Sequence, residues 1–252
     1  MSDVIIRATG TSAPFRFVLV SAKNTLNEIG KKHEATGNAM KFMAETAVAS
    51  LLLSSGLKFP GTVCLQADAQ ADSTPQGLVR AKPGTGKAPQ KMTVITLNEK
   101  SQRVKESIVE APSTQMGVNL TAYLMQSEQT KSATGIYFDI GFLLEAYPDA
   151  TSKDLEIMDA VIRNLPPLKN FSNVHDLLDQ LRGPYEVEIV KEIIPQAYCP
   201  CSLERVVASL NSLHKSEKKE MLEKDEILDV VCDFCKTHYE VSPQSVFKTT
   251  KQ

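Results

Sequence analysis

The sequence predicts an α+β protein in three parts: an N-terminal domain with an antiparallel or mixed sheet and packed helices (residues 1–148), a helical linker (149–194) and a small C-terminal domain (195–252). Three observations predict this organisation. Helical and strand-like segments of the first part do not follow the regular strand–helix–strand order of a doubly wound fold. Beyond Pro148 the apolar spacing becomes helical. The last part holds four of the five cysteines, in two tight pairs.

The first part begins with two strands and two helices. Apolar residues predict strands at 4–8 and 15–20, with a turn rich in Gly, Ser and Pro between them. Helices are predicted at 24–33 and 38–53. The second helix has apolar residues around most of its surface, so we expect it to be buried.

Short strands and a third helix complete the first part. Strand-like apolar runs occupy residues 63–65, 77–79 and 92–95. A helix is predicted at 118–128, and residues 135–144 are typical of strands with a glycine bend. The loop 82–87 lacks the G-x-x-x-x-G-K-[ST] pattern, which argues against a phosphate site. Cys64 lies in an apolar run, so we expect a buried core thiol.

The linker combines two helices and a strand. The first helix is indicated by apolar residues at helical spacing: Leu155, Ile157, Met158, Val161, Ile162 and Leu165. The prolines at 166–167 end it. Ser172 is expected to cap a short helix at 175–181, which Gly183 closes, and 185–194 alternates like a strand. The linker has too little apolar surface to fold alone.

Composition and charge narrow the class of protein. Hydrophobic residues make up 42% and charged residues 23% of the 252 residues, which is typical of a globular protein. The net charge is −2, whereas nucleic-acid binders usually carry a basic excess, so we expect no nucleic-acid partner. Residues 195–252 contain eight Lys or Arg and nine Asp or Glu, a net charge of −1, which argues the same for the last part.

The N-terminal sequence and the longest apolar stretch bear on localisation. The N-terminus has neither the basic segment nor the apolar core of a signal peptide. The longest apolar stretch, 46–57, is too short to span a bilayer. We therefore expect a cytoplasmic protein without a membrane partner, in a compartment where thiols are reduced.

Four cysteines near the C-terminus have the spacing of a metal site: Cys199, Cys201, Cys232 and Cys235. A C-x-C pair and a C-x-x-C pair are separated by thirty residues, 202–231. Four thiolates suit the tetrahedral coordination of Zn²⁺, so we predict one zinc site formed by all four. Apolar residues at helical spacing after Cys201 predict a small helical cover between the arms. His238 is an alternative ligand, although four cysteines already complete the shell.

The same arrangement allows a redox switch. A module of about 55 residues has a small core, and zinc would contribute on the order of 10–16 kcal/mol to its folding. Oxidation within each pair would close loops of only three or four residues and would remove the cross-link between the arms. The module should then lose most of its stability, and the linker would lose any surface on which it docks. The alternative is a structural zinc site without regulation.

Two motifs around the cysteines carry a family resemblance. The runs YCPCSLER (198–205) and VCDFCKTHY (231–239) closely resemble the C-terminal signature of the heat shock protein 33 family. Residues 6–10 (IRATG), 126–130 (QSEQT) and 141–148 (beginning GFLL) are similar to family landmarks in the same order. The resemblance covers nearly the whole chain, and the paired cysteines are its most specific part.

The resemblance implies a redox-regulated chaperone that binds unfolding proteins without ATP and is not an enzyme. It implies that the reduced form binds one zinc ion through the four cysteines and is inactive. Peroxide or hypochlorous acid, together with unfolding stress, would then form the disulfides Cys199–Cys201 and Cys232–Cys235, release zinc and unfold the linker. The activated protein would often be a homodimer and would protect unfolded or partly unfolded client proteins from aggregation.

The sequence departs from the family pattern in two places. The stretch 97–118 is shorter than in familiar members, which leaves open the sheet count and any dimer contact there. Pro200 lies between the first two cysteines, where it would alter how readily that disulfide forms. Two other classes of function are a zinc-ribbon adaptor and a thiol–disulfide oxidoreductase using Cys232 and Cys235. The order of elements before Cys232 lacks the thioredoxin-like setting that an oxidoreductase needs.

Overall fold

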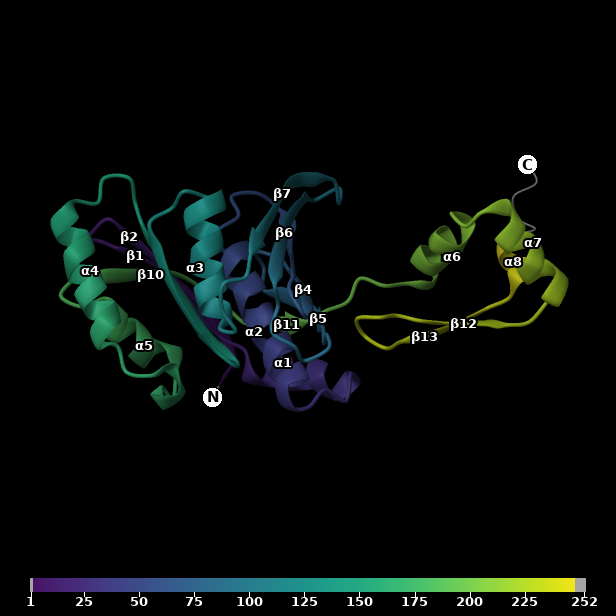
Figure 1. Ribbon diagram of the computed structural model, residues 1–252, viewed down its shortest axis with the longest axis horizontal. Coiled ribbons are helices and arrows are strands. Elements are labelled where there is room, and N and C mark those ends of the chain that lie inside the picture. Colours follow the sequence, from purple (N-terminus) through teal and green to yellow (C-terminus); the bar gives the residue numbers. More distant parts are fainter. Residues whose placement is uncertain (1, 248–252) are drawn as a thin grey trace. The chain divides into compact units, whose positions relative to one another are not determined.

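The structure is a computed structural model that describes residues 2–247 (Figure 1). The chain forms two compact units, one ending at Tyr198 and the other beginning at Cys199. Helices and largely antiparallel sheets occur together in it, which confirms the predicted α+β class. None of the described helices is both long enough and apolar enough to cross a bilayer.

A five-stranded antiparallel sheet organises one half of the first unit. Its strands lie in the order β10 (Val187–Ile193), β1 (Val4–Gly10), β2 (Phe15–Ser21), β9 (Ile140–Ala146) and β8 (Ser132–Tyr137). Side chains alternate between its two faces, as the period of a strand requires. Val18 and Val20 enter one hydrophobic cluster, whereas Phe17 and Leu19 enter another. Both faces of this sheet are therefore covered.

A six-stranded sheet forms the other half of the first unit. Its order is β11 (Gln196–Ala197), β5 (Leu78–Lys82), β4 (Gln70–Ser73), β3 (Gly61–Gln66), β6 (Lys91–Asn98) and β7 (Arg103–Glu110). β11 pairs with β5 in parallel and the other neighbours are antiparallel, so the sheet is mixed. The strands β4 and β7 were not predicted from the sequence.

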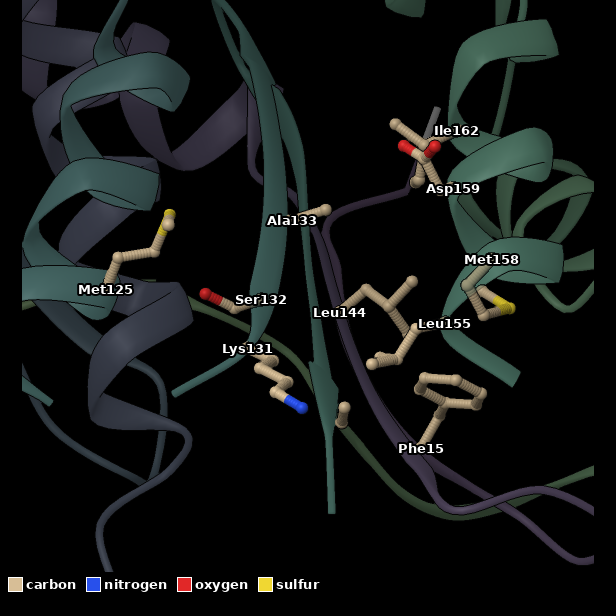
Figure 2. A pocket seen from close by; sticks show the side chains of 11 residues that line it. Phe15, Met125, Lys131, Ser132, Ala133, Leu144, Leu155, Met158, Asp159 and Ile162 are labelled. Atoms are coloured by element: carbon tan, nitrogen blue, oxygen red, sulfur yellow. The ribbon is translucent and has the colours of Figure 1, made fainter. Parts of the chain in front are cut away.

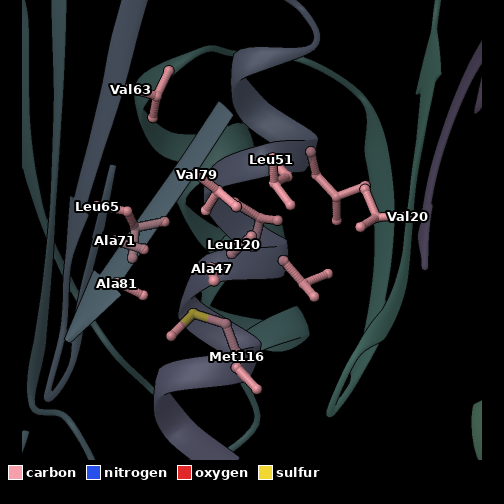
Figure 3. Close-up of a cluster of buried hydrophobic side chains, with 14 of the residues drawn as sticks. Val20, Ala47, Leu51, Val63, Leu65, Ala71, Val79, Ala81, Met116 and Leu120 are labelled. Carbon is pink, nitrogen blue, oxygen red and sulfur yellow. The ribbon is translucent and has the colours of Figure 1, made fainter. Parts of the chain in front are cut away.

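Helix α2 (Gly37–Ser54) fills the space between the two sheets. Twelve of its eighteen residues are buried, which confirms the expectation of a buried helix. Figure 3 shows Ala47 and Leu51 of α2 among side chains from both sheets and from α3 (Met116–Ser127), such as Val20, Val79 and Leu120. Helix α1 (Lys23–Lys32) lies beside α2 and β11.

The predicted linker segment covers the second face of the five-stranded sheet. It contains α4 (Ser152–Asn164), the short 3₁₀ helix η1 (Leu168–Asn170), α5 (Val174–Leu181) and β10. Figure 1 shows α4 and α5 on one side of β1 and β2, with α2 and α3 on the other. Met158 of α4 and Leu177 and Leu181 of α5 are buried there with Phe17 and Phe142.

Side-chain caps fix the ends of these two helices. Thr151 forms a capping box with Asp154 at the start of α4. The predicted cap of α5 was wrong by one residue, because Asn173 and not Ser172 accepts the Asp176 amide, at 2.8 Å. Gly183, with φ of +57°, follows the end of α5 as predicted.

A buried carboxyl in α2 gives the first testable prediction. Glu45 is 3% exposed, its Oε2 has no partner, and Oε1 lies 4.0 Å from Lys41 Nζ. Burial raises its pKa above the ordinary 4.5, so its charge costs stability increasingly as pH rises above that value. We expect Glu45→Gln to stabilise the protein by on the order of 1 kcal/mol at pH 8 and little at pH 4.5. Urea midpoints at both pH values test this, and an equal gain at both would contradict it.

The second unit is small and has little hydrophobic core. It contains α6 (Leu203–Asn211), α7 (Lys215–Lys224), β12 (Leu228–Val231), β13 (His238–Val241) and α8 (Pro243–Phe247). The small helical cover predicted between the cysteine pairs is present, as α6 and α7. α7 ends at Lys224, Asp225 after it takes the left-handed conformation, and Leu228 begins a strand. Only three of its described residues are buried: Val241, Pro243 and Val246.

Candidate metal centre

Two short segments bring the four cysteines together. Cys199 and Cys201 immediately precede α6, and Cys232 and Cys235 lie in the turn between β12 and β13. Their four sulfur atoms all lie within 4.8 Å of one another. The Sγ atoms of Cys199 and Cys232 are 3.7 Å apart, and those of Cys201 and Cys235 are 3.3 Å apart. The cluster therefore joins the two arms.

The spacing of the sulfurs fits a tetrahedral metal ion. With metal–sulfur bonds of about 2.3 Å, as in zinc sites, the corners of a tetrahedron are about 3.8 Å apart. The two sulfur–sulfur distances across the arms are close to this value. A thiolate donor set also suits a soft or borderline cation. These four cysteines can therefore hold a metal ion.

Local hydrogen bonds shape both arms. The Cys232 amide donates to the Thr237 carbonyl and the Lys236 amide donates to the Cys232 carbonyl, each at 2.9 Å. Lys236 takes a positive φ of 59°, which lets the chain turn tightly after Cys235. Ser202 caps α6 and so fixes the residue next to Cys201. The sulfurs are thus placed by turns at the ends of α6, β12 and β13.

Two hydroxyl groups contact the sulfur cluster, and sequence reasoning missed both. The Tyr239 hydroxyl donates to Cys201 Sγ at 3.0 Å, and Thr237 Oγ1 lies 3.2 Å from Cys235 Sγ. The signal that could have found them is proximity in sequence, because Thr237 and Tyr239 follow Cys235 by two and four residues.

Cys201 and Cys235 differ in the pKa of their thiols. Partial burial and hydrogen bonds to the other sulfurs raise the pKa of Cys201 to about 12. Burial opposes ionisation of Cys235 too, but hydrogen bonds with Thr237 and with neighbouring sulfurs outweigh it and lower its pKa to about 6. Charge on one sulfur therefore suppresses charge on another. A divalent cation would let all four become thiolates, so binding would release protons.

The structure does not place His238 with the cysteines. His238 Nδ1 lies 3.0 Å from Asp229 Oδ2, and its side chain is largely exposed. Among residues 2–247, the grouping of possible metal ligands at this site consists of the four cysteines alone. The alternative in which His238 binds the ion therefore has no support in the geometry.

The fifth cysteine lies in the first unit, apart from the cluster. Cys64 on β3 is half-buried rather than fully buried as expected, because Val63 and Leu65 take the core-facing positions of that strand. Its cross-strand neighbour is Asp72. Burial, and then the adjacent Asp72 carboxylate, raise the pKa of the Cys64 thiol to about 12. Cys64 is thus a poor nucleophile at neutral pH.

An apolar cavity of about 310 Å³ lies within the first unit, between α4 of the linker segment and the five-stranded sheet. Figure 2 shows Leu155 and Met158 of α4 facing Phe15 and Leu144 of the five-stranded sheet across this space. Most of the lining residues are apolar, and the charged ones are Lys131 and Asp159. The contact between α4 and the sheet is therefore incompletely packed, and such contacts have fewer attractive interactions to hold them.

This chain is similar to known proteins along nearly its whole length. A family model described as "Hsp33 protein" matches residues 3–242. The 33 kDa chaperonin of Microcystis aeruginosa is 28% identical over 98% of this chain and 97% of its own length. That of Lactobacillus johnsonii is 28% identical over 95% of each chain. The crystal structure of the Thermotoga maritima 33 kDa chaperonin covers 98% of this chain and 97% of its own, with a TM-score of 0.83 and 20% identity, and supports the fold.

Proposed function

The chain belongs to the Hsp33 family of chaperones, and from this premise we propose that it is a redox-regulated holdase that binds unfolding proteins without ATP. The observation that carries the proposal is the cluster of four sulfurs, drawn from two distant arms into a space of 4.8 Å. The reduced protein binds one zinc ion there and is inactive. Oxidation forms two disulfides, releases the ion and frees the linker.

Cys199, Cys201, Cys232 and Cys235 hold the zinc ion in this proposal. The ion, when bound, neutralises the thiolates and cross-links two arms that are otherwise thirty residues apart. The chain supplies the rest: the turns place the sulfurs, and the hydroxyls of Tyr239 and Thr237 contact two of them. The small core of this unit makes its fold depend on that cross-link.

The oxidation is a two-electron step in each cysteine pair. A thiolate sulfur attacks the O–O bond of a peroxide, forming a sulfenic acid and releasing hydroxide. The second thiolate of the pair attacks that sulfur, a disulfide bond forms, and a second hydroxide leaves. The pairs are Cys199–Cys201 and Cys232–Cys235, and each reduces one peroxide. Disulfide sulfurs are no longer thiolate ligands, so the metal site is lost.

The client surface in this proposal is the face of the five-stranded sheet that α4 and α5 cover. This face carries Phe15, Phe17 and Phe142, which are large apolar side chains suited to unfolded segments. The linker joins the second unit through β11, whose Gln196 amide donates to the Gly77 carbonyl at 2.9 Å. Unfolding of the second unit removes the structure that follows this short strand and so weakens the linker's attachment.

The proposal also assigns a role to each region of the chain, a location in the cell and a class of partner. Residues 1–148 form the chaperone core, 149–194 the metastable linker and 195–252 the zinc-dependent switch. The oxidised protein forms a homodimer, acts in the cytoplasm, and binds neither nucleic acid nor membranes. Proteins that unfold during oxidative stress are its clients, and it has no enzymatic role.

The experiment that tests this function measures metal content and client protection together. We expect the reduced protein to contain one zinc ion per chain and to leave aggregation of a chemically denatured client unchanged. Peroxide with mild heating should release the ion and suppress aggregation. Cys64→Ser, which removes a cysteine outside the cluster, should behave as wild type, whereas Cys232→Ser should lose the response to peroxide.

Two results would contradict the proposed function. One is oxidation that releases no zinc, and the other is zinc release without client protection. Reduction of insulin disulfides by the protein would favour an oxidoreductase that uses Cys232 and Cys235.

A further inference from the structure

The hydrogen bond between Tyr239 and Cys201 links the two cysteine arms without any metal ion. Tyr239 lies on β13, and Cys201 precedes α6, 38 residues earlier. The hydroxyl is 3.0 Å from the sulfur, and the Tyr239 side chain is half-buried. Because a tyrosine hydroxyl can donate one hydrogen bond, this contact directs its proton to Cys201.

Thr237 makes a similar contact with a second sulfur. Its Oγ1 lies 3.2 Å from Cys235 Sγ. A thiol could be the donor in the metal-free protein. In a metal-bound thiolate the sulfur carries no proton, so the Thr237 hydroxyl must donate. Two of the four sulfurs, Cys201 and Cys235, therefore have a hydroxyl donor when all four are thiolates.

A hydrogen bond donated to a thiolate changes its reactivity. It stabilises negative charge on sulfur and lowers the energy of the lone pair that attacks an electrophile. Groups outside the ligand set of a metal site tune its properties in this way. A thiolate becomes a weaker nucleophile as the pKa of its thiol falls, with a Brønsted coefficient of about 0.4–0.5. A decrease of one pKa unit therefore slows attack roughly threefold.

We propose that Tyr239 is a positioning residue that sets the peroxide sensitivity of the switch, with Thr237 acting in the same way on Cys235. This inference rests on the proposed function. The Tyr239 hydroxyl orients Cys201 and withdraws charge from its sulfur. The step that it slows is attack of the thiolate on the peroxide O–O bond, which forms an S–O bond and releases hydroxide. The switch thereby resists low peroxide concentrations and responds to higher ones.

The test uses reduced, zinc-loaded, full-length protein and a chromogenic zinc chelator. The rate of ion release is measured at several hydrogen peroxide concentrations, and its slope gives a second-order rate constant. We expect Tyr239→Phe to raise this constant roughly threefold. Tyr137→Phe is the matched control, because Tyr137 lies on β8 with an exposed side chain, and its constant should equal that of wild type.

A spectroscopic measurement separates tuning from a merely structural role. Cobalt(II) replaces zinc, and the sulfur-to-cobalt charge-transfer band is recorded in the absence of peroxide. Removing the hydrogen bond makes the sulfur a better electron donor, so the band of Tyr239→Phe should move to lower energy. The bands that report tetrahedral geometry should keep their positions.

The outcomes distinguish this inference from the proposed function. If wild type releases no ion with peroxide, the proposed function is wrong and this inference falls with it. If wild type releases its ion while Tyr239→Phe shows the same rate constant and the same band, only the inference is overturned. Should Tyr239→Phe fail to bind one metal ion per chain, the same two measurements are made on Thr237→Val, with the same expected changes. Thr237→Ser, which keeps the hydroxyl, should have the wild-type rate.

Discussion

Removal of the metal ion from the reduced protein should unfold the second unit while α2 and the two sheets around it keep their structure. The described part of the second unit buries only three side chains, and neither α6 nor α7 buries any. Helices of nine and ten residues are not stable alone in water. A four-cysteine zinc site contributes on the order of 10–16 kcal/mol to folding, more than the net stability of most domains.

Hydrogen exchange of the reduced protein with and without a strong zinc chelator measures this effect. We expect the amides of α6 and α7 to lose their protection completely when the ion is removed. The amides of α2, which is buried between two sheets, should keep theirs. Cys232→Ser should reproduce the unfolded second unit without chelator, and Cys64→Ser should not. Protected α6 and α7 amides in metal-free protein would show that the small core is sufficient.

The parts of the fold that the sequence predicts well are those with long, regular apolar patterns. Helix α2 is apolar on all sides and occupies nearly the predicted range. The strands β4 and β7 were missed, because β4 has the polar sequence QADS and β7 (RVKESIVE) is rich in charged residues without a regular alternation of apolar and polar side chains. Both form because neighbouring strands supply hydrogen-bond partners, which local sequence does not reveal.

Strand pairing between residues far apart in the sequence also determines where the linker segment packs. Its helices and strand were predicted from spacing, but their partners were not. β10 pairs with β1, so that Ile193 lies opposite Ile5. These two residues lie near opposite ends of the first unit's sequence. Spacing therefore predicted a segment that cannot fold alone, and the structure supplies the surface that it covers.

The candidate metal centre, too, was predicted in part from the sequence and depends in part on packing between distant segments. The cysteine spacing was enough to predict that four sulfurs meet. It could not show that Cys199 Sγ lies 3.7 Å from Cys232 Sγ across the arms, because that depends on how the turn between β12 and β13 meets the start of α6. The contact between Tyr239 and Cys201 depends on the same packing.

Replacing Leu177 and Leu181 together with Ala should make the reduced, zinc-loaded protein protect clients without oxidation. Both side chains are fully buried on α5 against the five-stranded sheet. Each Leu→Ala change in a core costs about 2–5 kcal/mol. Two of the four buried residues of α5 are thereby lost, and the neighbouring α4 buries only Met158 and borders a cavity of about 310 Å³. In the double variant α5 should therefore detach from the sheet in a large fraction of molecules.

The measurement is client aggregation in the presence of reducing agent, with zinc content determined in the same samples. We expect one zinc ion per chain together with protection that wild type shows only after oxidation. Leu65→Ala is the matched control, since Leu65 is equally buried but belongs to the cluster around α2, so its loss destabilises the unit without uncovering the face under α5. If hydrogen exchange shows α5 detached in the double variant and aggregation proceeds as without chaperone, the sheet face under α5 is not the client surface. Protection by Leu65→Ala at the same level would instead mean that general destabilisation is sufficient, because only the double variant uncovers Phe17 and its neighbours directly.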